Sequence, residues 1–245
     1  MCTVSWNYCP DGLHVFCNRD EQRSRPKARP PERHTSATGA NYLAPIDPVG
    51  GGSWIAVNDQ GLLVTLLNYY QRQSVVPPAG PATSRGLLVT GLMDCGTPDA
   101  VSAILATRVK HARAFHLIAA HPDHPVRAWT WDGATLTAAP NPTSALPWSS
   151  SSFQTDDVLA WRSEQYQNVR HAPSPLQAAR AFHATRHPEV GAFGICMERD
   201  DACTQSFSHI TIGANNIAYR YTDGFPDDSN APTSLTNLPR SGGVS

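Results

Sequence analysis

Charge and long apolar runs are both scarce in this 245-residue sequence. Only 16% of the residues are charged and the formal net charge is −1, so electrostatics gives no reason to expect nucleic acid or an anionic membrane as a partner. No stretch of eighteen apolar residues occurs, and no membrane span is therefore predicted. The start of the chain has neither a positively charged segment nor a hydrophobic signal core, which predicts a cytoplasmic protein.

Several signatures of cofactor binding and catalysis are also missing. The sequence has no G-x-G-x-x-G, no P-loop and no G-x-S-x-G elbow, so it lacks the usual evidence for a dinucleotide-binding, P-loop or α/β-hydrolase protein. The six cysteines are Cys2, Cys9, Cys17, Cys95, Cys196 and Cys203. None of their spacings forms a C-x-x-C pair, so we predict free thiols, no bound metal and no cofactor.

Cys2 is the cysteine whose position changes its chemistry. It directly follows Met1, and removal of Met1 is expected because Cys is small. The chain would then begin with a thiol and a free α-amino group, and an amine that titrates near neutrality can accept the thiol proton. Retained Met1 would block this base. The ordinary alternative is that Cys2 is simply an early strand residue.

A β-hairpin is predicted to bring charged residues back toward Cys2. Residues 3–17 are rich in β-forming side chains, interrupted by a Pro-Asp-Gly turn signal at 10–12. A three-residue loop would place Asp20 opposite Cys2, with their Cβ atoms about 5 Å apart. A two-residue turn is expected to shift the pairing by one residue and to place Glu21 there instead.

The remaining pattern alternates between blocks of strands and pairs of helices. Strands are expected at 53–57, 62–67, 115–120, 126–131, 135–138, 192–198, 206–212 and 216–221, and helices at 84–94, 97–109, 155–170 and 174–183. Residues 22–50 are expected to form an irregular surface loop, and 223–245 a disordered tail. We therefore predict an α/β (α+β) fold in one domain, residues 1–222, with two packed sheets and a helix pair on each, a four-layered αββα sandwich.

Six short motifs then point to a family. In order along the chain they are Cys2-Thr3, Asn18-Arg19-Asp20-Glu21, Ser24-Arg25-Pro26, Gly51-Gly52-Ser53-Trp54, Leu67-Asn68-Tyr69 and Ser84-Arg85-Gly86-Leu87-Leu88-Val89. With these motifs the chain resembles the NRDE family (transport and Golgi organisation protein 2-like), which is similar to the N-terminal nucleophile hydrolases. The resemblance covers most of residues 1–222 and is strongest before residue 90, and it implies the αββα fold.

The resemblance also implies roles for four residues. Cys2 would be the nucleophile and its own α-amino group the base. Arg19 would favour the thiolate, because a neighbouring cation lowers the pKa of a thiol. Asp20 would orient the amine, and Asn68 would contribute to an oxyanion hole.

Two departures from the family pattern affect the expected site. Members often carry Leu-Ser-Asn where this chain has Trp148-Ser149-Ser150-Ser151, so a second oxyanion donor is either absent or is a serine, Ser150. Members also often carry Gly-Thr-Arg-Ser where this chain has Cys203-Thr204-Gln205-Ser206. Gln205 thus stands where an arginine would supply a fixed cation.

Two functions remain open at this point, and both have a small-molecule partner. The first is a hydrolase that cleaves a linear amide or acyl bond through a Cys2 thioester. The second is a non-catalytic protein that uses the same pocket to bind or traffic haem or an acyl lipid. The intact set of Cys2, Arg19, Asp20 and Asn68 favours the enzyme, whereas the changes at Ser150 and Gln205 favour the carrier.

Overall fold

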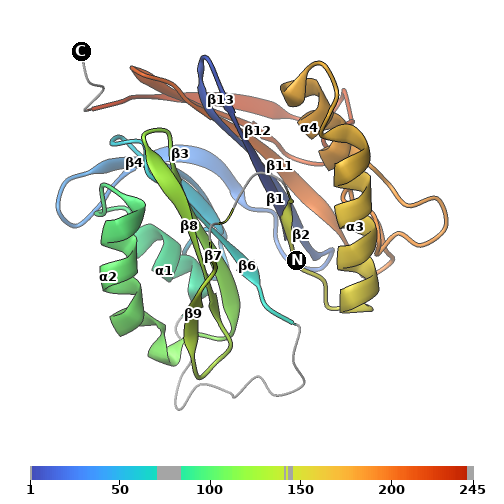
Figure 1. Ribbon diagram of the computed structural model, residues 1–245, viewed down its shortest axis with the longest axis horizontal. Helices are drawn as coiled ribbons and strands as arrows, with labels where there is room; N and C mark the ends of the chain where they lie inside the picture. The colour runs from blue at the N-terminus through green and yellow to red at the C-terminus, as the bar shows by residue number, and fades with distance from the viewer. Residues whose placement is uncertain (1, 71–83, 141, 143–145, 242–245) are drawn as a thin grey trace.

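The computed structural model describes residues 2–70, 84–140, 142 and 146–241. Within these residues the strands form two antiparallel sheets that pack face to face, and helices cover the outer face of each (Figure 1). The order of layers is helix, sheet, sheet, helix. The predicted αββα sandwich is therefore confirmed. Met1, whose removal the sequence predicts, lies outside the described residues.

In the described chain, six strands make the first sheet, in the order β10-β1-β2-β11-β12-β13. These strands are β1 (Cys2–Cys9), β2 (Gly12–Gln22), β10 (Trp148–Ser149), β11 (Ala202–Ile212), β12 (Asn216–Thr222) and β13 (Thr233–Pro239). The N-terminal strand thus lies inside the sheet, between the short strand β10 and its hairpin partner β2. This position ties down the first residues of the chain.

The second sheet has seven strands among the described residues, in the order β3-β4-β5-β6-β7-β8-β9. They are β3 (Arg29–Thr35), β4 (Asn41–Ile46), β5 (Ile55–Asn58), β6 (Leu63–Asn68), β7 (Phe115–His121), β8 (His124–Trp131) and β9 (Leu136–Ala138). Strands β5 and β6 are almost entirely buried, because each has packed side chains on both faces.

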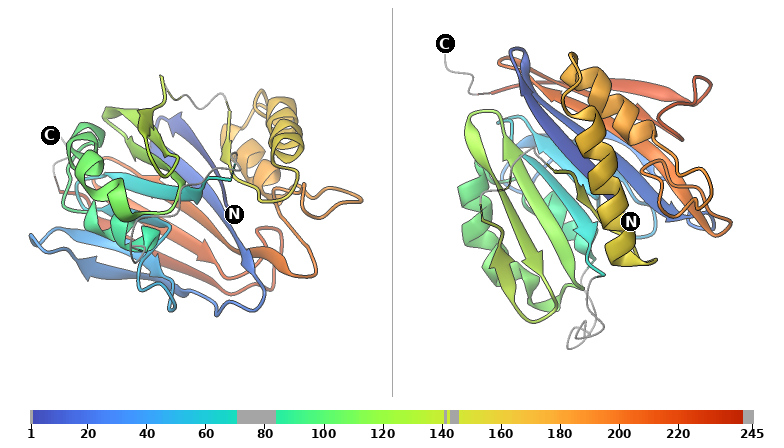
Figure 2. Two further views of the ribbon diagram at one scale, coloured as in Figure 1. Left: turned by 90° about the horizontal axis from the view of Figure 1, so that it is seen from below. Right: turned by 45° about the vertical axis from the view of Figure 1, so that its right-hand side comes forward.

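Two helix pairs complete the layers. The helices are α1 (Arg85–Gly91), α2 (Pro98–Arg108), the short 3₁₀ turn η1 (Val109–His111), α3 (Thr155–Val169) and α4 (Pro175–Ala184). Helices α1 and α2 pack on strands β5 to β8, whereas α4 packs on β1 and β2 with α3 beside it (Figure 2). No helix among the described residues is long and apolar enough to cross a membrane.

The largest part of the core lies between the two sheets. Alternate residues of β1 point inward, as the two-residue period of a strand requires, so Val4 and Trp6 share one core cluster with Ile55 and Ile118 of the opposite sheet. The intervening residue Ser5 faces the helices and hydrogen-bonds a side chain of α4. The first strand therefore faces the opposite sheet on one side and a helix layer on the other.

The register of the first hairpin differs from both predicted alternatives. Cys9 pairs with Gly12 across a two-residue turn, and Cys2 consequently faces Arg19. Neither Asp20 nor Glu21 stands opposite Cys2. Gly12 takes a positive φ of 134°, a conformation that glycine adopts without steric cost, and this allows the shorter turn.

Residues 22–50 are not the irregular loop that their prolines suggest. They contain β3 and β4, which pair with each other, and β3 forms the edge of its sheet. Proline is tolerated at a sheet edge because the missing N–H faces away from the ladder. The register also shifts between Arg29 and Glu32, which accommodates Pro30 and Pro31.

Two further predictions near the C-terminus are wrong. Residues 192–198 were expected to be a strand, but they form turns with a single β-bridge at Glu198. Residues 223–245 were expected to be a disordered tail, yet β13 lies within them and pairs with β12 over its whole length. The polar composition of residues 223–245 gave the wrong prediction because edge strands such as β13 carry many polar residues.

Candidate active site

A pocket of about 350 Å³ opens at the N-terminal end of β1. All four residues predicted for the site, Cys2, Arg19, Asp20 and Asn68, line it. The volume lies within the range of small-molecule sites, about 300–1,000 Å³. Arg19 and Asp20 belong to β2, while Asn68 ends β6, so the pocket is formed by the ends of strands from both sheets.

Cys2 is held by hydrogen bonds on both sides of its backbone. Its N–H donates to Ser150 Oγ at 3.1 Å, and its carbonyl accepts from the Ser150 N–H at 3.0 Å. Ser150 therefore acts as an acceptor toward the nitrogen that would become the α-amino group. It was expected either to be an oxyanion donor or to leave that donor missing, and the structure gives it this different contact.

The thiol of Cys2 is buried, with 7% of the residue exposed. Burial raises the pKa of this thiol, and the positive charge of Arg19 acts against that rise. The neutral thiol is thus the stable form before a substrate binds. A nucleophile in this state needs a base within reach, because only the thiolate attacks efficiently.

Arg19 stands directly across the ladder from Cys2 and is held by Gln205, Asp47 and Trp54, among other neighbours. Its guanidinium donates to Gln205 Oε1 at 2.8 Å and to Asp47 Oδ2 at 3.2 Å, and lies 4.6 Å from the centre of the Trp54 ring. Gln205 replaces the arginine expected from the family pattern with an acceptor that binds Arg19. The residue that stands in place of one cation therefore positions the other.

Asp20 points to the other side of the sheet from Arg19, toward α3. Its Oδ1 accepts a hydrogen bond of 2.7 Å from Thr204. Burial raises the pKa of the Asp20 carboxyl, while the charge of Arg162 in α3 opposes the rise. Asp20 and Arg162 are thus two buried groups whose charges influence each other behind the nucleophile.

Arg162 is a site-supporting residue that the sequence analysis missed. It is fully buried and its guanidinium reaches Thr3 Oγ1 at 3.0 Å and Ser149 Oγ at 2.7 Å. The same group donates to the carbonyls of residues 192, 193 and 194. These carbonyls therefore serve a side chain and not a sheet ladder, which explains why no strand forms there. Arg162 falls four residues after Val158 on the buried stripe of α3, and an arginine on an apolar stripe was the available signal.

Asn68 ends β6 at the pocket. Its Nδ2 donates to the Tyr70 hydroxyl at 2.7 Å. A side-chain amide has two N–H groups, so Asn68 has the donor chemistry that an oxyanion hole requires.

Comparison with known protein families identifies the family to which the sequence belongs. A model of the family described as Transport and Golgi organisation 2 matches residues 1–180. The chain belongs to the Transport and Golgi organisation 2 family. No curated protein matches the sequence.

Solved structures with the same fold are N-terminal nucleophile hydrolases. Penicillin V acylase from Agrobacterium tumefaciens matches with a TM-score of 0.59 at 9% identity, covering 97% of this chain and 86% of that one. The Caenorhabditis elegans orthologue of N-acylethanolamine-hydrolyzing acid amidase gives 0.57 at 9%, covering 96% and 100%. A mutant conjugated bile acid hydrolase from Clostridium perfringens gives 0.55 at 10%, covering 97% and 96%. At these identities the likeness shows the fold.

The glycines in the motifs of this Transport and Golgi organisation 2 family member allow two backbones to touch. A Cβ on Gly52 would lie 2.2 Å from the Gly86 carbonyl carbon, and one on Gly86 would lie 2.9 Å from the Ser53 nitrogen. A hydrogen bond of 3.1 Å from the Ser53 N–H to the Gly86 carbonyl stabilises this close approach. It brings the loop before β5 against the start of α1 and closes one wall of the pocket.

Asn18, the first residue of the Asn-Arg-Asp-Glu motif, has a structural contact outside the pocket. Its Nδ2 donates to the carbonyls of His183 and Ile195 at 2.9 and 2.8 Å, and its Oδ1 lies 2.9 Å from His183 Nδ1. Asn18 thereby anchors α4 on β2. One four-residue motif thus serves two purposes, with Asn18 holding the fold and its neighbours lining the pocket.

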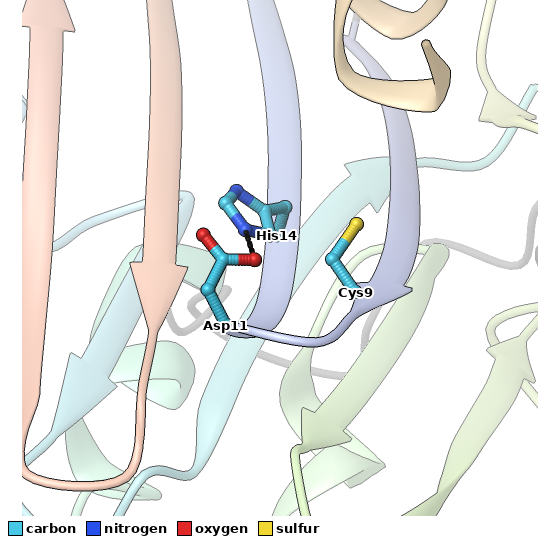
Figure 3. A group of neighbouring side chains, drawn as sticks. All are labelled: Cys9, Asp11 and His14. Carbon is cyan, nitrogen blue, oxygen red and sulfur yellow. Dashed lines mark hydrogen bonds and ion pairs between the residues drawn. The ribbon is translucent and has the colours of Figure 1, made fainter. Parts of the chain in front are cut away.

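The hairpin at the opposite end of β1 gathers three groups of metal-ligand type. Cys9, Asp11 and His14 place their ligand atoms within 4.8 Å of one another (Figure 3). Arg180 can only donate, and it donates to His209 Nδ1 at 3.1 Å, so the proton of neutral His209 lies on Nε2 and goes to His14 Nδ1 at 3.1 Å. His14 must then donate from Nε2 to Asp11 at 3.0 Å. That nitrogen has no lone pair for a metal, and the cluster fits a hydrogen-bonded chain better than a metal centre.

Proposed function

We propose that this protein hydrolyses linear amide or acyl bonds, with Cys2 as the nucleophile and its own α-amino group as the base once Met1 is removed. The observation that supports this most strongly is the environment of Cys2. Its thiol lines a small-molecule pocket, its nitrogen is oriented by Ser150, and Arg19 faces it across the ladder. The solved structures that share the fold are named as acylases, hydrolases and amidases.

In the first half of the proposed reaction the amine takes the thiol proton as sulfur attacks the carbonyl carbon. The carbonyl oxygen becomes an oxyanion, which the Asn68 amide would stabilise. The carbon–nitrogen bond then breaks, and the α-ammonium returns the proton to the leaving amine. The acyl group remains on Cys2 as a thioester.

Water completes the proposed cycle. The α-amino group accepts a proton from the water as its oxygen attacks the thioester carbonyl. The carbon–sulfur bond breaks, the carboxylic acid leaves, and the thiol regains its proton. Ser150 Oγ accepts a hydrogen bond from the Cys2 nitrogen, so a remaining N–H would stay oriented while the nitrogen lone pair faces the reacting proton.

The alternative, a carrier of haem or an acyl lipid, fits the described pocket lining less well. Four arginines and three acidic residues line the pocket, whereas haem presents a broad apolar ring. Among the described lining residues, Cys2 alone is of a type that commonly serves as an axial haem ligand, so these residues offer no second axial ligand. The polar lining favours a ligand that carries charge and hydrogen-bonding groups.

Intact-mass spectrometry with brief, sub-stoichiometric iodoacetamide tests the nucleophile. We expect loss of Met1 and labelling of Cys2 in preference to Cys203, a half-buried thiol outside the described pocket lining. Retained Met1, or equal labelling of the two thiols, would contradict the mechanism.

A matched pair of variants separates the thiol from the amine. Cys2→Ala removes the nucleophile, while insertion of one alanine between Met1 and Cys2 keeps the thiol and moves the α-amino group away. Both should abolish hydrolysis of a panel of acyl amides, and Cys203→Ser should retain it. Full activity in the insertion variant would show that another group is the base.

A further inference from the structure

The charges that line the pocket do not balance one another. Arg19 and Arg25 share Asp47, with nitrogen–oxygen distances of 3.2 and 2.8 Å, and both also lie within 3.7 Å of Glu21. Although burial opposes it, hydrogen bonding from Arg25 holds the pKa of Asp47 below its usual value. Two carboxylates thus compensate these two arginines.

Arg85 and Arg113 line the same pocket without such compensation. Among the described residues neither forms an ion pair with a carboxylate. Arg85 donates to the carbonyl of Ala114 at 2.9 Å, which fixes its guanidinium beside β7. Burial lowers the pKa of Arg85, and the like charge of Arg113 acts in the same direction. Both guanidinium groups thus lack a carboxylate partner among the described residues, and for the half-buried Arg85 burial makes a bound anion favourable.

An independent feature of the lining is an unsatisfied donor. Trp54 is 92% buried, being 8% exposed, and its indole N–H has no hydrogen-bond partner among the described residues. Buried donors are nearly always paired in proteins. Because Trp54 lines the pocket, an acceptor oxygen of a bound ligand would satisfy it.

The pocket lining also has an apolar component, the side chains of Trp54 and Leu66. Such side chains offer contact to a short acyl chain.

We infer that the substrate is an amide carrying an oxyanion group, a carboxylate or a phosphate, and that Arg85 and Arg113 bind this group. The inference rests on the proposed function, since it places the amide carbonyl at Cys2 and the anion at Arg85 and Arg113. A guanidinium matches carboxylate and phosphate geometry with two parallel hydrogen bonds. The two arginines would therefore select among amides by charge.

The test compares N-hexanoylglycine with the uncharged N-hexanoylglycinamide. Calorimetric titration into the Cys2→Ala protein measures binding without turnover. We expect the acid to bind at least about tenfold more tightly, because a charge-assisted hydrogen bond contributes that much or more. Arg85→Gln and Arg113→Gln, each in the Cys2→Ala background, should remove this preference, whereas Arg33→Gln, at an exposed position of β3, should retain it.

Three outcomes would overturn the inference. They are equal binding of the two probes, no measurable binding of either, and an unchanged preference in both pocket variants. Arg113 is exposed, so Arg113→Gln gives a folded variant if Arg85→Gln does not fold. Competition by hexyl phosphate and by hexanoate then separates the two anions, and the tighter competitor identifies the group.

Turnover of the same probes by the unmodified protein separates this inference from the proposed function. Hydrolysis of both probes at equal kcat/KM would support the hydrolase and overturn the anion preference. Selective binding of the acid without hydrolysis would support the anion site and contradict the proposed hydrolase activity.

Discussion

Acidification should destabilise the protein through His183, which is completely buried between α4 and β2. Its neutral form satisfies both ring nitrogens. Nδ1 donates to Asn18 Oδ1 at 2.9 Å, and Nε2 accepts from the Ser5 hydroxyl at 2.9 Å. A second ring proton would face the serine hydroxyl inside the core, and burial accordingly lowers the pKa of His183 to about 3.

The sign and size of the effect follow from proton linkage. Between its ordinary pKa of 6.5 and the folded value of about 3, the unfolded chain binds a proton at this residue that the folded chain does not. Stability therefore falls as the pH falls through this window, by up to about 1.4 kcal/mol per pH unit. From pH 7 to pH 5 the loss from His183 amounts to about 2 kcal/mol.

Urea unfolding of the wild type and of His183→Gln at pH 7, 6 and 5 measures this contribution. Glutamine does not titrate, so the variant should lose about 2 kcal/mol less than the wild type between pH 7 and pH 5. His171→Gln removes an exposed histidine and should follow the wild-type curve. Parallel curves for the wild type and His183→Gln would refute the linkage argument.

Three further changes test the pocket wall, its buried support and the amine contact. Gly52→Ala places a Cβ against the backbone of Gly86 and should cost about 1–3 kcal/mol in urea unfolding. Gly50→Ala meets only side-chain atoms, the nearest being Ser84 Oγ at 3.3 Å, and should cost less. Arg162→Met leaves three backbone carbonyls without their hydrogen-bond donor and should lower the free energy of unfolding by about 3–5 kcal/mol. An unchanged stability would show that the cost of burying the Arg162 charge cancels the gain from its hydrogen bonds. Ser150→Ala should lower kcat/KM for an acyl amide about tenfold by releasing the Cys2 nitrogen while the Tm stays within a few degrees, and an unchanged kcat/KM would remove Ser150 from the mechanism.

Sequence patterns predicted most of the fold where a local signal was strong. The β5–β6 hairpin is a pair of apolar runs around a turn, and α2 begins at Thr97-Pro98, where the threonine side chain caps the helix. The errors lie where distant partners decide the conformation. Strands β3 and β13 are polar and form sheet edges, so a strand at these positions depends on β4 and β12 being present.

The supporting residues of the site were hard to predict for a similar reason. Ser150 is 148 residues from Cys2 in sequence, and Asp47 is 28 residues from Arg19. These residues come together because separate segments of the chain pack against one another. The spacing of residues along the sequence does not encode such contacts. The short motifs identified Cys2, Arg19 and Asp20 because these residues lie on one hairpin.

The single-residue error in the hairpin register has a chemical consequence. Opposed residues in a ladder share one face of the sheet, so a shift by one residue exchanges the faces of Arg19 and Asp20. With Cys2 opposite Arg19, the cation lies on the face of the thiol, while Asp20 lies behind it with Thr204 and the charge of Arg162. A three-residue turn would have put the carboxylate beside the thiol, where a negative charge opposes ionisation. The two-residue turn at Pro10-Asp11 therefore determines which charge the nucleophile meets.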